Sequence, residues 1–149
     1  MIRLEYVSYT YPQSQGYAIK KINLTIRENE FIAVMGRNGS GKSTLARLLN
    51  GLLLPVAGEV AVDGLSSRQA ENRAEIRKRV GLLFPDPDSQ LLSNLVEEEI
   101  AFGLENLGLD PSEIRTRVDT VLEMVAMEDY AKYPPYLLSG GQKQKLCIA

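Results

Sequence analysis

A glycine-rich stretch in the first third of the chain carries the residue types that bind phosphate. Residues 36–44 read GRNGSGKST and match the pattern G-x-x-x-x-G-K-[ST] in full. Glycines let the backbone curl around a phosphate group, Lys42 can reach the β- and γ-phosphates, and the Ser43 hydroxyl can hold Mg²⁺. The stretch predicts a site for a nucleoside triphosphate, with Ser43 as the metal ligand. The expected binding residues are Gly36, Asn38, Gly39, Ser40, Gly41, Lys42, Ser43 and Thr44.

The segments on either side of this loop are those that such a site requires. The apolar run 31–35 (FIAVM) predicts a short buried parallel strand, and residues 45–50 (LARLLN) favour the opening of a helix. The loop therefore joins the carboxyl end of a strand to the amino end of a helix. Backbone amides point outward at a helix start, and the helix dipole favours negative charge there. We therefore expect the phosphate groups at this helix start.

Composition limits the class of protein. The chain of 149 residues is one domain's worth of sequence, and 44% hydrophobic with 24% charged residues is typical of a globular protein. A net charge of −2 offers no basic surface, so no nucleic-acid partner is expected. No apolar run approaches the roughly 20 residues of a membrane helix. The single cysteine, Cys147, agrees with a reducing cytosol, and the chain has no histidine for a mechanism that needs one.

Periodicity predicts the remaining elements. Residues 2–9 alternate as a half-exposed antiparallel strand, with Ile2, Leu4 and Tyr6 on one face. Asp110 is the expected cap of a helix, with Glu113 three residues later as in a capping box. Further strands are predicted at 22–27, 59–64 and, fully buried, 80–84; the helices are predicted at 68–79, 96–107 and 110–125. The last helix has an apolar stripe that we expect in the core: Ile114, Val118, Val121, Leu122 and Val125.

A second motif precedes the final helical segment. Residues 138–142 read LSGGQ. Small residues at a helix start allow an anion to approach closely, and Ser139 can donate a hydrogen bond to phosphate. A simple helix cap explains the same residues. The motif therefore indicates a phosphate-binding site only in combination with the phosphate loop upstream.

With both motifs in place, the chain resembles the nucleotide-binding domains of ABC transporters, whose signature is LSGGQ. The resemblance covers residues 1–149 and implies an α/β fold: a P-loop NTPase core, an antiparallel β subdomain and a helical subdomain at about residues 93–140. Two such domains face head to tail in that family. The resemblance thus implies that Ser139, Gly140, Gly141 and Gln142 act in trans on ATP held by the other subunit. It also implies an aromatic residue stacked on adenine, for which Tyr11 is our prediction; Tyr9 and Tyr17 are the rivals.

Three segments look more specifically like the ATPase subunits of energy-coupling-factor importers: 7–12 (VSYTYP), 87–90 (PDSQ) and 96–109 (VEEEIAFGLENLGL). Those bacterial complexes carry vitamins or transition-metal ions. The resemblance implies ATP and Mg²⁺ as ligands, a second ATPase subunit (the same or a sister chain), a transmembrane coupling protein and a substrate-binding membrane subunit as partners. It places the chain peripherally on the cytoplasmic face of the bacterial cell membrane.

Two departures from the family pattern bear on catalysis. Pro85 stands where the family has a glutamine that contacts Mg²⁺, and we do not assign Gln90 to that role. The Walker B aspartate and the catalytic glutamate lie beyond the position that matches Ala149. We therefore expect a truncated chain with no catalytic residue of its own, in which the missing C-terminal part of the core sheet leaves apolar surface exposed.

Two other functions remain open at this point. One is a non-catalytic nucleotide-binding module that pairs with a complete ATPase, which Pro85 and the missing carboxylates favour. The other is a DNA-repair ATPase that shares the signature. The stretch between Lys42 and Ser139 is too short for the coiled coil of such proteins. The net charge of −2 also argues against the basic surface that DNA binding requires.

Overall fold

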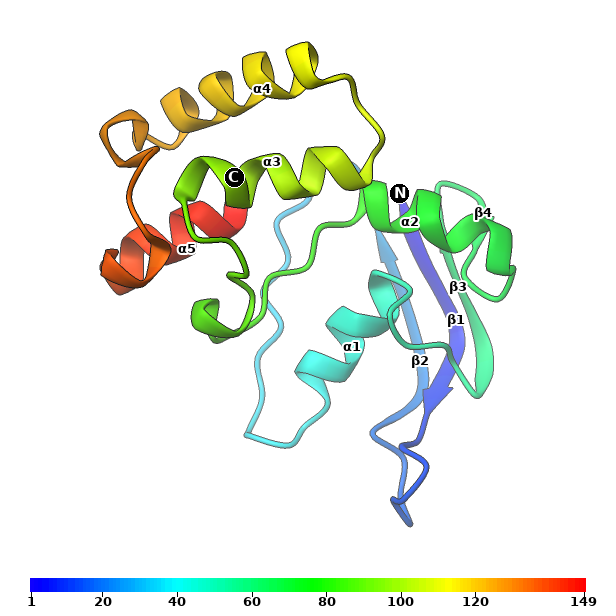
Figure 1. The fold of residues 1–149 in the computed structure, drawn as a ribbon. Coiled ribbons are helices and arrows are strands. Elements are labelled where there is room, and N and C mark those ends of the chain that lie inside the picture. Colours follow the sequence, from blue (N-terminus) through cyan, green and yellow to red (C-terminus); the bar gives the residue numbers. More distant parts are fainter. The chain divides into compact units, whose positions relative to one another are not determined.

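The computed structural model describes residues 1–149 and divides into two compact units, residues 1–82 and 83–149 (Figure 1). The first unit is built on one four-stranded antiparallel sheet in the order β2-β1-β3-β4. The strands are β1 (Ile2–Tyr9), β2 (Ile19–Ile26), β3 (Ala57–Val62) and β4 (Leu65–Ser66). The three predicted antiparallel strands are confirmed, with β2 beginning earlier than expected, and the two-residue β4 was not predicted.

Two helices complete the first unit. α1 (Lys42–Leu49) follows the phosphate loop, and its fully buried Leu48 packs into a core with Leu4, Val7 and Val60 of the sheet. α2 (Arg73–Arg79) is shorter than the predicted helix, because residues 70–72 form a 3₁₀ turn instead.

A bulge in β1 overturns the predicted alternation of that strand. Leu4 pairs with Leu24 but Val7 pairs with Ile22, so β1 carries one extra residue between the two pairs. The extra residue lies at Tyr6, which has φ 49° and is 68% exposed, whereas Val7 is fully buried. The prediction that Tyr6 shares one face with Ile2 and Leu4 is therefore wrong: an inserted residue inverts the alternation of everything after it.

Two side chains stabilise the displaced backbone of the bulged region. The amide of Tyr6 donates to the side-chain carbonyl of Asn23 at 2.8 Å. The amide of Lys21, which also has positive φ, donates to the Ser8 hydroxyl at 2.9 Å. Side-chain acceptors thus replace ladder bonds that the irregular register cannot supply.

The two predicted buried strands, 31–35 and 80–84, are not strands in this structure. Phe31 is 96% exposed, Met35 is 90% exposed and Leu83 is 51% exposed. A central parallel strand needs neighbours that supply backbone partners on both sides. No strand of the structure pairs with either segment, so their apolar side chains stay at the surface.

The second unit is helical. Its helices are α3 (Val96–Asn106), α4 (Pro111–Met124) and α5 (Gly140–Ile148), with short 3₁₀ turns at Pro87–Ser89, Glu128–Tyr130 and Pro135–Leu137. Figure 1 shows α3 and α4 running alongside each other. The predicted stripe of α4 faces the core, where its buried members are Val118 and Leu122.

The predicted cap of α4 is correct in position only. Asp110 occupies the N-cap, yet its side chain makes no capping hydrogen bond. Glu113 instead forms an ion pair with Arg117 one turn later, at 2.7 Å. No helix of the structure is both long enough and apolar enough to cross a membrane.

Candidate nucleotide-binding site

Two glycines give the phosphate loop its path. Gly39 has φ 79° and Gly41 has φ 95°, conformations that residues with a Cβ adopt at a cost. Gly41 has a second constraint: a Cβ added there would lie 2.5 Å from the carbonyl oxygen of Ala18. The loop and the start of β2 are therefore in backbone contact, and only glycine fits at the contact.

The amino end of α1 is open to an anion. Gly41 is its N-cap and offers no side-chain cap, and its first turn contains no acidic residue. The amides of the first turn have no acceptor within the helix, and the dipole favours negative charge beside them. Ser43 is exposed, and its hydroxyl makes no hydrogen bond with the protein.

Lys42 supplies the positive charge of the site. Its ammonium group donates to the carbonyl oxygens of Gly36 at 2.8 Å and Arg37 at 2.9 Å. The lysine side chain thus curls back over the loop, which places its charge beside the backbone that would surround a phosphate. Thr44, in contrast, is only 6% exposed.

A cavity of ≈ 500 Å³ joins this loop to the hairpin loop between β1 and β2. It brings together all the predicted binding residues except Gly36. The hairpin contributes further lining residues that sequence reasoning did not assign to the site. The full lining is Tyr11, Ser14, Gly16, Tyr17, Ala18, Asn38, Gly39, Ser40, Gly41, Lys42, Ser43 and Thr44.

The three tyrosines near the cavity have different environments. The hydroxyl groups of Tyr11 and Thr44 lie 3.0 Å apart in a hydrogen bond, so Tyr11 is tied to the first turn of α1. The ring of Tyr11 also meets that of Tyr9 edge to face, with centroids 5.0 Å apart. Tyr9 is only 9% exposed and belongs to the core, whereas Tyr17 is 58% exposed on the cavity wall.

The signature residues form a capped helix start in the second unit. The Ser139 hydroxyl accepts from the amide of Gln142 at 3.4 Å, and the Gln142 side chain accepts from the amide of Ser139 at 2.8 Å. Nothing lies within 4 Å of a Cβ added at Gly140 or Gly141. None of these residues lines the cavity at the phosphate loop.

The segment that follows the predicted second buried strand has no metal ligand at Pro85. The side chain of Gln90 accepts a hydrogen bond from the amide of Phe84 at 2.9 Å, which holds the turn together. No group of three or more His, Cys, Asp or Glu side chains in the structure is arranged to hold a metal ion.

The sequence profile of one family, ABC transporter, matches residues 19–149. The chain belongs to the ABC transporter family. The energy-coupling factor transporter ATP-binding protein EcfA of Syntrophomonas wolfei is 58% identical over the whole chain, and EcfA1 of Clostridium perfringens is 48% identical. The chain spans 55% and 54% of these two relatives, about half their length.

Solved structures of family members have the same fold. The structure of cbiO1 from Clostridium perfringens, part of the transporter complex cbiONQ, is 36% identical and superimposes with a TM-score of 0.85 over 99% of this chain and 59% of its own. The cassette MJ0796, in a dimeric post-hydrolysis state bound to ADP and Pi, is 32% identical with a TM-score of 0.85, covering 99% of this chain and 67% of its own. The predicted α/β fold, a P-loop NTPase core with β and helical subdomains, is confirmed.

Proposed function

We propose that the cavity at the phosphate loop binds ATP. The observation that carries the proposal is the uncapped amino end of α1, with Lys42 beside it and a tyrosine-lined wall opposite the loop's own residues. The amides and the lysine suit the phosphate groups, and an aromatic side chain suits the base. Tyr11 is the proposed base-stacking residue, because Tyr9 is buried in the core.

The binding step follows from the contacts of Lys42. Its ammonium group bonds to the carbonyl oxygens of Gly36 and Arg37. Phosphate oxygens offer a negatively charged acceptor, and charge-assisted hydrogen bonds are stronger than bonds to neutral carbonyls. Lys42 is therefore expected to exchange one or both carbonyl contacts for the β- and γ-phosphates.

The donor set suits Mg²⁺ held mainly by the nucleotide. Mg²⁺ keeps several waters and takes one or two protein ligands beside phosphate oxygens. The exposed Ser43 hydroxyl, free of other hydrogen bonds, is the proposed protein ligand. The ion would neutralise charge on the phosphate groups when bound.

The assembled state requires a second copy or a sister ATPase. We propose that residues 1–149 form the N-terminal part of an ABC-type ATP-binding domain, with a helical subdomain at about residues 93–140. Ser139, Gly140, Gly141 and Gln142 would then complete the ATP site of the partner. The dimeric cassette MJ0796 with ADP and Pi supports this arrangement by similarity.

The similarity to EcfA proteins extends the proposal to transport. The chain would belong to an ATPase subunit of an energy-coupling-factor importer, which couples ATP binding and hydrolysis to uptake of a vitamin or a transition-metal ion. Its partners would be a transmembrane coupling protein and a substrate-binding membrane subunit, at the cytoplasmic face of the membrane. The similar protein cbiO1 is part of the transporter complex cbiONQ, which supports an assembly of this kind.

A non-catalytic module that binds ATP and pairs with a complete ATPase is the second candidate. It is favoured by Pro85, which has no side chain to hold Mg²⁺, and by Gln90, whose carbonyl is engaged by Phe84. ATP turnover by the purified chain would exclude this candidate.

The test is a titration of the chain with a fluorescent ATP analogue and Mg²⁺, alongside the Lys42→Ala variant. We expect saturable binding that the variant loses by tenfold or more, on the order of a lost charge-assisted contact. Binding of the variant with unchanged affinity would contradict the role of the phosphate loop.

A further inference from the structure

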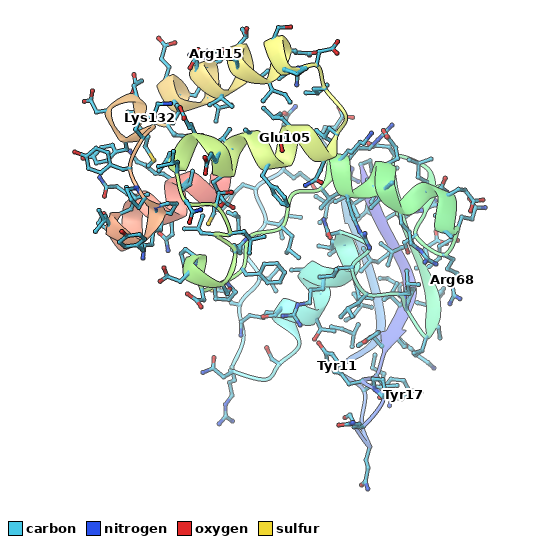
Figure 2. The ribbon with its side chains drawn as sticks, viewed as in Figure 1. Tyr11, Tyr17, Arg68, Glu105, Arg115 and Lys132 are labelled. Atoms are coloured by element: carbon cyan, nitrogen blue, oxygen red, sulfur yellow. The ribbon has the colours of Figure 1, made fainter.

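The wall of the nucleotide cavity includes a second tyrosine with an open ring. Tyr17 lines the cavity together with Tyr11, and Figure 2 shows both labelled at the same end of the sheet, on the hairpin loop between β1 and β2. Tyr17 is 58% exposed, and its hydroxyl makes no hydrogen bond with the protein. A flat aromatic surface that faces a cavity is suited to contact a flat ligand.

The hairpin loop holds Tyr17 at a defined place. The amide of Ala18 donates to the carbonyl of Tyr9 at 2.9 Å, which closes the loop at its base. The Thr10 hydroxyl donates to the carbonyl of Gly16, also at 2.9 Å, and braces the residue just before Tyr17. Bonds on both sides of Tyr17 therefore restrict where its ring can lie.

The phosphate loop touches the residue next to Tyr17. The Cα of Gly41 is so close to Ala18 that an added Cβ would be 2.5 Å from the Ala18 carbonyl. Gly41 is the N-cap of α1, the point at which the phosphate groups are proposed to bind. Tyr17 is thus one residue from a backbone contact with the anion site.

The two tyrosines of the cavity are held by different contacts. Tyr11 is fixed by its bond to Thr44 and by the ring of Tyr9. The ring of Tyr17 is approached by the ammonium group of Lys20, 5.7 Å from its centroid. A cation within about 6 Å of a ring centroid is attracted to the ring face, so Lys20 can help to hold the orientation of the Tyr17 ring.

We propose that Tyr17 is a second base-contacting residue of this site and that Lys20 positions its ring. The inference rests on the proposed ATP site and deepens it, because it assigns the adenine of ATP two aromatic contacts, Tyr11 and Tyr17, from one hairpin. Aromatic side chains contribute to base binding without contacting the phosphate groups. Tyr17 therefore adds affinity for ATP over an inorganic polyphosphate.

The experiment compares two probes on the same chain by calorimetry: Mg²⁺–ATP and Mg²⁺–tripolyphosphate, which has the phosphate groups and no base. We expect Tyr17→Ala to raise the Kd of ATP by about five- to tenfold and to leave that of tripolyphosphate unchanged. Tyr17→Phe keeps the ring and should bind both probes like the parent chain. Lys20→Ala should weaken ATP binding by about twofold, as expected for an exposed cation–π contact.

Tyr6→Ala is the matched control, because Tyr6 is an exposed tyrosine of the same sheet that does not line the cavity. Unchanged ATP affinity in Tyr17→Ala, with binding lost in Lys42→Ala, would overturn the inference and leave the ATP site standing. Equal losses for ATP and tripolyphosphate would show a disturbed phosphate loop and would also overturn it. If the parent chain binds neither probe, the proposed site and the inference fail together.

Discussion

The phosphate loop and the signature present the same structural element, the amino end of a helix, in two different states. At α1 the N-cap is Gly41, which has no side chain to satisfy the free amides. At α5 the side chains of Ser139 and Gln142 satisfy amides of their own turn. At α1 no side chain competes with an anion for the first amides, whereas at α5 the cap already occupies the amides of Ser139 and Gln142. The two helix starts therefore differ in how many of their amides already have a partner within the protein.

The largest expected difference concerns the two glycines at these helix starts. Gly41→Ala combines positive φ with a clash against the Ala18 carbonyl and should lower the free energy of unfolding by about 2–3 kcal/mol. At Gly140 an added Cβ meets open space in a helical turn. Gly140→Ala should therefore raise the free energy of unfolding, by less than about 1 kcal/mol. Urea unfolding followed by circular dichroism measures both. Equal destabilisation by the two changes would contradict the prediction that only Gly41 is constrained to be glycine.

Removing the cap of α5 tests the other side of the comparison. Ser139→Ala should cost about 0.5–1 kcal/mol of stability, at the lower end for a cap because the bond of 3.4 Å is long. Ser139→Asp restores a capping oxygen and is the matched control. ATP affinity of the single chain should not change in either variant, since Ser139 is proposed to contact ATP held by the partner subunit. A loss of ATP binding in Ser139→Ala would contradict the division of roles.

A smaller effect is expected where Tyr11 meets α1. Tyr11→Phe removes the hydroxyl bound to Thr44 and keeps the ring, so it should cost about 0.5–1 kcal/mol of stability. ATP affinity should fall less than in Tyr11→Ala, which also removes the aromatic surface. Equilibrium unfolding and ATP titration of the two variants separate the hydroxyl from the ring. Equal ATP affinities for both variants would argue against base stacking by Tyr11.

The smallest effect is a change in thiol reactivity on α5. Burial, with added repulsion from the carboxylates of Glu99 and Asp88, raises the pKa of Cys147 above its ordinary value. A raised pKa keeps the thiol protonated to higher pH, and only the thiolate is nucleophilic. Alkylation of the folded chain should therefore accelerate at higher pH than that of the urea-unfolded chain. In Ser139→Ala the profile should move toward the unfolded one if the cap helps to hold α5 in place.

The sequence was sufficient for several features that depend on local pattern. The phosphate loop, the helix after it and the stripe of α4 follow from spacing alone, because their determinants lie within a few turns of chain. The runs 31–35 and 80–84 have strand composition, yet strand formation depends on partners elsewhere in the chain. Apolar composition cannot show whether those partners are present.

Two further differences have causes that composition does not encode. Asp110 and Glu113 fit a capping pattern, but Glu113 pairs with Arg117 and leaves the cap unused. Ser14, Gly16 and Ala18 of the hairpin were not assigned to the site, because their approach depends on the contact between Gly41 and Ala18. The contact between Gly41 and the start of β2 is a tertiary contact, and neither segment's sequence predicts it alone.

The bulge at Tyr6 has a consequence for a site that it does not touch. In a strand the side chains alternate between the two faces. One inserted residue therefore exchanges the inward and outward positions of all residues that follow it. After Tyr6 the inward positions become Val7, Tyr9 and, just beyond the strand, Tyr11, which packs on the same core. If the same residues alternated regularly, with no bulge, Tyr11 would fall on the opposite face of the strand from Leu4. The bulge in mid-strand thus places Tyr11 on the side of the sheet that packs against α1.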